Sequence, residues 1–187
     1  MPRASVDDVR RADRVLVYGV TGSGKSTAAG RLGQALALPV HLADEEVGWL
    51  PDWVLREVEE QRAIAARIVA QQGWVLDTAY GSFLDVVLPR VQVVVALDHP
   101  RWLSLWRLVR RTTHRWITRT PVCNGNVESL RQILSRDSIL LWHFRSYGRK
   151  TARIRAWESQ PDGIPVLRLT HPRQLDALLA ELGAGRS

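Results

Sequence analysis

Residues 19–26 read GVTGSGKS and match, at every fixed position, the pattern GxxxxGK followed by Ser or Thr. The apolar residues 14–18 before them suit a buried parallel strand, and the Ala- and Leu-rich residues 27–38 after them suit a helix. A glycine-rich loop between a strand and a helix is the setting in which this pattern surrounds phosphate groups with backbone N–H groups. The sequence therefore predicts a phosphate-binding loop.

Two side chains of this loop have predicted chemical roles. Lys25 is expected to reach the terminal phosphates of a nucleotide, and the Ser26 hydroxyl is expected to bind Mg²⁺. The chain has 24 arginines but only two lysines, Lys25 and Lys150, so a lysine at the one loop position that requires it argues against a chance match. The predicted nucleotide-binding residues of the loop are Gly19, Thr21, Gly22, Ser23, Gly24, Lys25, Ser26 and Thr27.

The size and composition of the chain predict a single domain over residues 1–187, with a sheet covered by helices on both faces. One cysteine, Cys123, excludes an internal disulfide framework and a multi-cysteine zinc site. No apolar run approaches the roughly 20 residues that span a bilayer, and residues 1–13 lack the apolar core of a secretory signal. We therefore expect a cytoplasmic protein with no membrane partner, as a monomer or a dimer.

The net charge of +7 is unevenly distributed. Residues 101–155 contain 13 Lys and Arg but only two acids, Glu128 and Asp137, so this block carries +11 and the rest of the chain −4. Such a block indicates an anionic partner, of which nucleoside phosphates and nucleic acid are the two candidates. A basic face that is simply solvated is the third alternative.

Apolar runs and turn residues divide the rest of the chain into alternating strands and helices, which predicts a doubly wound parallel sheet. In the helix that starts at Arg101, Trp102 and Trp106 share one face and are expected to pack in the core. The expected further strands cover residues 38–43, 74–77, 91–97 and 164–169, and the expected further helices cover residues 52–72 (with Asp52 as the cap), 101–115, 127–157 and 172–182, with a mobile loop over 116–126.

An acidic residue follows three of these strands: Asp44, Asp77 and Asp98. Parallel sheets bind ligands at the carboxyl ends of their strands, so the three carboxylates are expected near the phosphate loop, although turns also favour Asp. Asp77 is predicted to hold Mg²⁺ through water, with Asp98 as the alternative. Asp44 is predicted to be a general base or a ligand of the acceptor hydroxyl, with a turn or cap residue as the alternative.

With the loop and the strand ends in hand, the chain resembles the adenylate-kinase-like branch of P-loop kinases. Gly73-Trp74-Val75-Leu76-Asp77 is similar to that group's third-strand motif, whose Asp organises Mg²⁺. Leu97-Asp98-His99-Pro100 is similar to its lid entry. The resemblance implies that Arg107 stacks on the nucleotide base and that Arg111, one helical turn later, reaches phosphate.

A closer resemblance is to the small bacterial family called topology modulation or adenylate-kinase-related proteins, and it covers roughly residues 14–170. It implies a P-loop NTPase fold with a five-stranded parallel sheet in the order 2-3-1-4-5 and a helical lid at about residues 112–126. The motifs that carry it are Pro39-Val40 with Asp44, Trp49-Leu50-Pro51-Asp52-Trp53, Trp74 with Asp77 and Tyr80, Leu97 to Trp102, and Leu141-Trp142-His143-Phe144-Arg145.

The chain departs from adenylate kinases on the acceptor side. Adenylate kinases have Asp-Gly-Phe-Pro-Arg after the third strand, whereas residues 77–81 here read Asp-Thr-Ala-Tyr-Gly, without the arginine that would hold an AMP phosphate. Residues 44–46, Asp-Glu-Glu, are acidic. An acidic pocket favours a hydroxylated or cationic acceptor over a nucleoside monophosphate.

The sequence thus predicts phosphoryl transfer from Mg-ATP to an unidentified small acceptor, with ATP and Mg²⁺ as cofactors. The alternative is a nucleotide-switched ATPase that regulates nucleic acid or a protein partner. Because several arginines lie on the helix that should face the loop, the enzyme is favoured. The predicted catalytic residues are Lys25, Asp44, Arg107, Arg111 and Arg145, and the predicted metal-binding residues are Ser26, Asp77 and Asp98.

Overall fold

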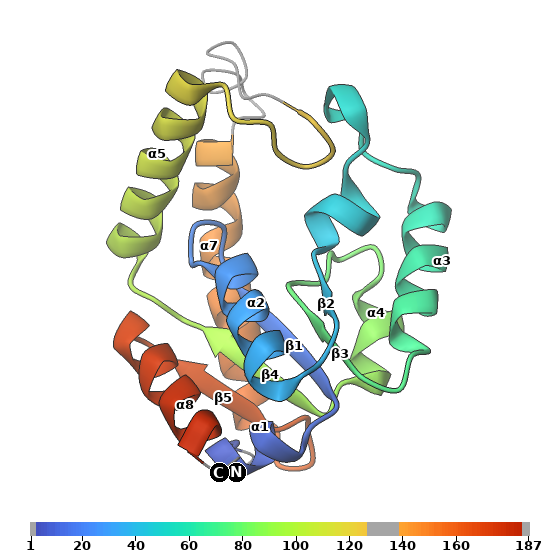
Figure 1. The fold of residues 1–187 in the computed structure, drawn as a ribbon, viewed down its shortest axis with the longest axis vertical. Coiled ribbons are helices and arrows are strands. Elements are labelled where there is room, and N and C mark those ends of the chain that lie inside the picture. The colour runs from blue at the N-terminus through green and yellow to red at the C-terminus, as the bar shows by residue number, and fades with distance from the viewer. Residues whose placement is uncertain (1–2, 127–138, 185–187) are drawn as a thin grey trace.

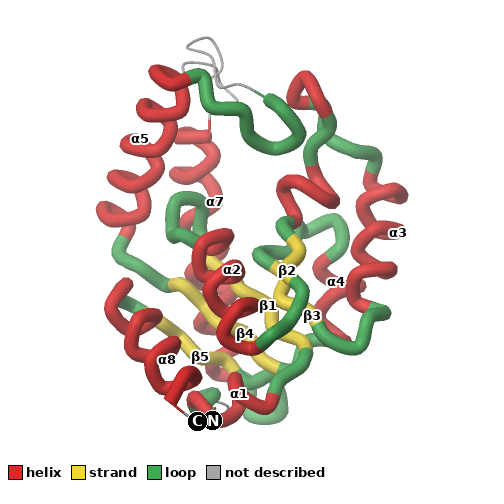
Figure 2. The backbone as a smooth tube through the Cα atoms, viewed as in Figure 1, coloured by secondary structure: helices red, strands yellow, loops and turns green. Residues whose placement is uncertain are grey.

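A computed structural model describes residues 3–126 and 139–184. Five strands form one parallel sheet in the order β2-β3-β1-β4-β5, with helices on both faces (Figures 1 and 2). This confirms the predicted fold class and strand order. The predicted helical residues 127–138 lie outside the described part of the chain. None of the helices within that part is long and apolar enough to cross a membrane.

The elements have the following bounds. The strands are β1 (Arg14–Gly19), β2 (Val40–His41), β3 (Trp74–Leu76), β4 (Val93–Leu97) and β5 (Val166–Leu169). The helices are α1 (Val6–Arg11), α2 (Lys25–Leu36), α3 (Val58–Val69), α4 (Leu84–Val87), α5 (Arg101–Thr118), α7 (Ile139–Ser159) and α8 (Pro172–Ala184), with short helical turns at Asp44–Gly48, Pro51–Trp53 and Leu88–Arg90.

The central strand β1 pairs with β3 on one side and β4 on the other, so that Leu16 lies opposite both Leu76 and Val94. Residues 15–19 of β1 and all of β4 are buried. A continuous apolar run is what a parallel strand needs when helices cover both of its faces. The phosphate loop therefore starts at the carboxyl end of the most enclosed strand.

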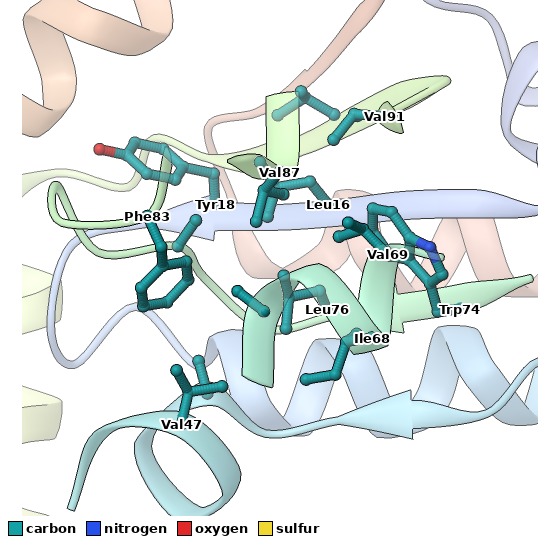
Figure 3. Packing of buried hydrophobic residues seen from close by; sticks show 14 of the residues in the cluster. Leu16, Tyr18, Val47, Ile68, Val69, Trp74, Leu76, Phe83, Val87 and Val91 are labelled. Carbon is teal, nitrogen blue, oxygen red and sulfur yellow. The ribbon is translucent and has the colours of Figure 1, made fainter. Parts of the chain in front are cut away.

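Alternate residues of β1 supply two cores, one on each face of the sheet. Leu16 and Tyr18 pack with residues of α3, α4 and α7 (Figure 3). Val15 and Val17 pack with residues of α1, α2 and α8 on the other face. This period of two follows from the strand geometry, because successive side chains point to opposite faces.

The helix expected from Asp52 begins six residues later, at Val58. Asp52 does not cap it: Asp52 and Trp53 both have left-handed backbone angles, with φ of 61° and 57°. They belong to a 3₁₀ turn that starts at Pro51. The segment between β2 and α3 is thus an arm of short turns rather than the first part of a helix.

The expectation that Trp102 and Trp106 pack in the core is wrong. Their exposed fractions are 70% and 54%. The buried face of α5 consists of Ser104, Leu108 and Thr112, which recur every four residues. Ser104 Oγ lies 2.9 Å from His143 Nε2, so small and polar residues, rather than the tryptophans, face α7.

Two glycines of α2 provide a matched test of how this helix packs on β2. A Cβ at Gly33 would lie 2.1 Å from Val40 Cγ2 and 3.0 Å from the Leu38 carbonyl oxygen, whereas a Cβ at Gly30 would meet nothing within 4 Å. We expect Gly33→Ala to lower the free energy of unfolding by about 1–3 kcal/mol through overpacking. Gly30→Ala should raise it by about 0.5–1 kcal/mol through helix propensity. Equal effects of the two variants in denaturant unfolding would contradict the packing of α2 on β2.

Candidate functional site

The loop between β1 and α2 makes tight turns that require glycine. Gly22 and Gly24 have φ angles of 81° and 94°, which side chains rarely allow. A Cβ at Gly22 would lie 2.3 Å from the Ser104 carbonyl oxygen, so α5 also requires a glycine there. Lys25 Nζ donates to the Val20 carbonyl at 3.0 Å. The glycine-rich loop, the first turn of α2 and Lys25 thus lie together in the kind of arrangement that favours phosphate groups.

Asp77, at the end of β3, joins the loop to the neighbouring strand β2. Ser26 Oγ donates to Asp77 Oδ2 at 2.6 Å, and the Ala43 N–H donates to Oδ1 at 2.8 Å. Burial raises the pKa of Asp77 to about 6, although these hydrogen bonds and Lys25 oppose the rise. The sequence prediction paired Ser26 with Asp77, and the structure brings the two together.

A hydroxyl and a carboxylate oxygen are ligands that suit Mg²⁺, which usually keeps several waters and binds phosphate oxygens as well. Ser26 and Asp77 fit that ligand set. Within the described residues there is no group of three or more His, Cys, Asp and Glu residues that could hold a metal by itself. Asp98 has a different contact: its Oδ2 accepts from Arg168 at 3.2 Å, and Arg168 also pairs with Glu158 at 3.0 Å.

Asp44 is the first residue of the turn that follows β2. It is exposed and accepts a hydrogen bond from the Tyr80 hydroxyl. Burial and then the Asp44 charge raise the pKa of Tyr80 well above its usual value, so this hydroxyl stays protonated. Asp44 also acts electrostatically on the pKa values of Lys25 and Asp77. Tyr80 was part of a motif in the sequence but was not predicted as a site residue.

The predicted arginines divide between the two helices. On α5, Arg107 donates to the Ser23 carbonyl of the loop at 3.4 Å, and Arg111 lies near enough to Lys25 to lower its pKa. On α7, Arg145 is exposed, and its role in the site stays a prediction. Lys150, five residues later on the same helix, has its Nζ 3.4 Å from the Gly19 carbonyl oxygen. The helical pattern of α7 did not show which side faces the loop.

The end of the predicted lid contacts the arm between β2 and α3 (Figure 1). Asn124 Nδ2 donates to the carbonyls of Glu45 and Trp49, at 2.8 and 2.6 Å. Asn126 accepts from the Trp53 N–H at 2.8 Å and donates to the Leu50 carbonyl at 2.9 Å. These bonds connect the segment after α5 to the arm between β2 and α3.

Cys123 lies beside these contacts. Burial, followed by the charges of Asp44 and Glu45, raises its pKa to about 11. The thiol is therefore protonated at neutral pH and is a poor nucleophile.

None of the protein-family models searched matches the chain, and a search of curated proteins gives no match. Its fold is similar to that of solved kinases. A shikimate kinase from Acinetobacter baumannii aligns with a TM-score of 0.56 and 14% identity over 96% of both chains. A shikimate kinase from Aquifex aeolicus has a TM-score of 0.52 and 15% identity, over 92% of this chain and 94% of that one.

A gluconokinase from Sinorhizobium meliloti 1021 aligns with a TM-score of 0.51 and 16% identity, over 92% of this chain and 90% of that one. At identities this low, the similarity establishes the fold alone. The near-complete coverage of both chains shows that the likeness extends beyond the sheet to the surrounding helices.

The contacts between the predicted lid and the arm can be tested by hydrogen exchange. Asn126→Ala removes the acceptor of the Trp53 N–H and the donor to Leu50, so amides of residues 49–54 and 120–126 should lose protection by several-fold to about tenfold. Thr120→Ala is the control, because the Thr120 hydroxyl hydrogen-bonds Thr118 of the same segment. Unchanged protection in Asn126→Ala would show that these bonds do not hold the two segments together in solution.

Proposed function

We propose that this protein is a kinase that transfers the terminal phosphoryl group of ATP to a hydroxyl group of a small molecule. One observation carries the proposal: Lys25 of the phosphate loop has two carboxylates as electrostatic partners, Asp44 on the acceptor side and Asp77 on the metal side. A cation for the phosphates, a carboxylate for the metal and a second carboxylate for the acceptor would thus lie at the same edge of the sheet, after β1, β3 and β2. Similarity of fold to solved kinases supports the proposal.

Positioning and charge neutralisation supply most of the rate of phosphoryl transfer. Lys25 and the loop N–H groups would hold the terminal phosphates, and Arg107 and Arg111 would neutralise the charge that develops on the transferred group. Mg²⁺ bound by Ser26 and, through water, by Asp77 would shield the phosphate oxygens. Each residue lies on or against the loop or the end of β3, so the arrangement is held by rigid elements.

Asp44 would take the proton of the acceptor hydroxyl as its oxygen forms the new bond to phosphorus and the bond to the ADP oxygen breaks. Its hydrogen bond from Tyr80 holds the carboxylate toward the site. Glu46 of the same turn is used structurally, because it binds His41 and the Leu42 N–H. Asp44 and Glu45 are left as the acidic groups of the acceptor side.

The acceptor class follows from this acidic side. Two of the similar structures are named as shikimate kinases and one as a gluconokinase; shikimate and gluconate carry hydroxyl groups but are anions, so they support a hydroxyl acceptor and not its charge. Carboxylates accept hydrogen bonds from hydroxyl groups and attract cations, whereas they repel phosphate. We therefore propose a hydroxylated or cationic acceptor rather than a nucleoside monophosphate.

A second function has one specific observation in its favour. The exposed rings on the outer sides of α5 and α7 carry stacked arginines: Arg110 lies 5.5 Å from the centre of the Trp106 ring, and Arg149 lies 5.9 Å from that of Trp142. Exposed aromatic rings with arginines are features of surfaces that bind single-stranded nucleic acid. A nucleotide-switched protein that binds nucleic acid is therefore the alternative to the kinase.

The role of the loop lysine is tested by Lys25→Ala. We expect this variant to lose ATP-dependent turnover and to bind ATP at least about tenfold more weakly, because the terminal phosphates lose their main cation. Arg31→Ala is the matched control: it removes a cation from the same helix, where Arg31 pairs with Asp176 at 2.8 Å. ATP affinity measured by calorimetry that is equal in both variants would refute the phosphate-loop assignment.

The acceptor side is tested by measuring ADP release in the presence of nucleosides, nucleotides, sugars and aminoglycoside-like polyols. With the acceptor that stimulates release, Asp44→Asn should reduce kcat by about 10²–10⁴-fold, because the general base is lost, and should leave ATP affinity unchanged. Glu45→Gln should change kcat little.

One outcome would contradict the role of Asp44, and another would contradict the kinase itself. Full activity of Asp44→Asn would remove the proposed base. Tight, salt-tolerant binding of DNA without acceptor-stimulated ADP release would favour the nucleic-acid-binding alternative, because scattered phosphate contacts alone weaken steeply with salt.

A further inference from the structure

The only two lysines of the chain meet at the carboxyl end of β1. Lys25 comes from the first turn of α2, and its Nζ lies 3.0 Å from the Val20 carbonyl oxygen. Lys150 comes from the middle of α7, and its Nζ lies 3.4 Å from the carbonyl oxygen of Gly19. Two ammonium groups from opposite parts of the fold therefore hydrogen-bond consecutive carbonyls at the entry of the phosphate loop.

Cations and the ring of Tyr18 surround Lys150. Its Nζ lies 5.9 Å from the centre of that ring, and Arg153 donates to the Tyr18 hydroxyl at 3.3 Å. No carboxylate of the described residues lies within ion-pair distance of Nζ. Burial, together with the charges of Lys25 and of the neighbouring arginines 149 and 153, lowers the pKa of Lys150 to about 7, and Asp44 opposes this shift. Burial also lowers the pKa of Lys25.

The charge of Lys25 lowers the pKa of Lys150, so the two partly buried ammonium groups repel one another, and a carbonyl oxygen compensates a positive charge only weakly. An anion between them would remove the repulsion and satisfy both. The loop beside them is shaped for a phosphate, which has several strong acceptor oxygens. The arrangement of charges thus calls for an anionic ligand that reaches from Lys25 to Lys150.

We propose that Lys150 is a second phosphate-binding lysine, which contacts the terminal phosphates of the bound nucleotide from the α7 side while Lys25 contacts them from the α2 side. The proposal rests on the proposed function only in that the loop binds a nucleoside triphosphate. It assigns to Lys150 the position on α7 that the sequence suggested for Arg145. These residues are five apart, so they lie on different sides of the helix.

A purely structural role would also account for the Gly19 contact, with Lys150 as a tether between α7 and β1. The two roles differ in what nucleotide does to the ammonium group. If Lys150 contacts phosphate, bound nucleotide stabilises its charged form and raises its pKa. If Lys150 only connects α7 to β1, bound nucleotide leaves its pKa unchanged or breaks its hydrogen bond to Gly19.

Because the chain has only two lysines, labelling with ¹³Cε-lysine gives one NMR signal for each, and Lys150→Arg assigns them. We expect the Lys150 signal to titrate near pH 7 in the free protein and at least one pH unit higher with Mg²⁺ and a non-hydrolysable ATP analogue. A response of Lys25 alone would overturn the role of Lys150. A response of neither signal would instead contradict nucleotide binding, and with it the proposed function.

Variants give a second, independent measurement. Lys150→Met should weaken binding of the ATP analogue about tenfold or more, and Lys150→Arg should retain most of the affinity because it keeps the charge. Arg149→Met is the matched control, since it removes a neighbouring cation that is exposed and stacks on Trp142. Thermal unfolding checks that each variant is folded. Equal affinities of folded Lys150→Met and Arg149→Met would overturn the proposal.

Discussion

The enclosure of β1 between β3 and β4 is the constraint on which the rest of the structure depends. A strand with partners on both sides and helices on both faces has all its backbone groups paired and cannot shift. The loop that follows it therefore starts from a fixed point. Parallel pairing brings the carboxyl ends of the neighbouring strands to the same edge, so Asp77 meets Ser26 and the turn after β2 places Asp44 against Tyr80.

The helix α5 has three different sides: one faces the loop, one faces α7 and one is exposed. Its sequence shows which residues share a side but not where each side points. Arg107 and Arg111, one turn apart, face the loop, while Ser104 faces α7 through His143. The tryptophans are on the remaining side and are exposed. Small residues at the contact let α5 approach the loop closely, since the Ser104 carbonyl occupies the space that a side chain at residue 22 would need. Bulky aromatic side chains at the positions of α5 that contact the loop would prevent this close approach.

The electrostatics of the site are unbalanced in the protein alone. Burial lowers the pKa values of Lys25 and Lys150 and raises that of Asp77, so each charged form is disfavoured relative to water. Groups held in this way gain more from a ligand of opposite charge than solvated groups do, because less water must be displaced. A nucleotide with its metal supplies both signs of charge at once, which is the complement that this cluster lacks.

The sequence by itself predicted the glycine-rich loop and the parallel sheet, because these follow from a local motif and from the alternation of strands and helices, and the family resemblance implied the strand order. It also predicted the pairing of Ser26 with Asp77. Only the tertiary structure decided that α3 begins at Val58, that Tyr80 binds Asp44, and that Lys150 contacts the start of the loop. The physical reason is that helical spacing shows which residues share a face, whereas the rotation and packing of each helix decide where that face points.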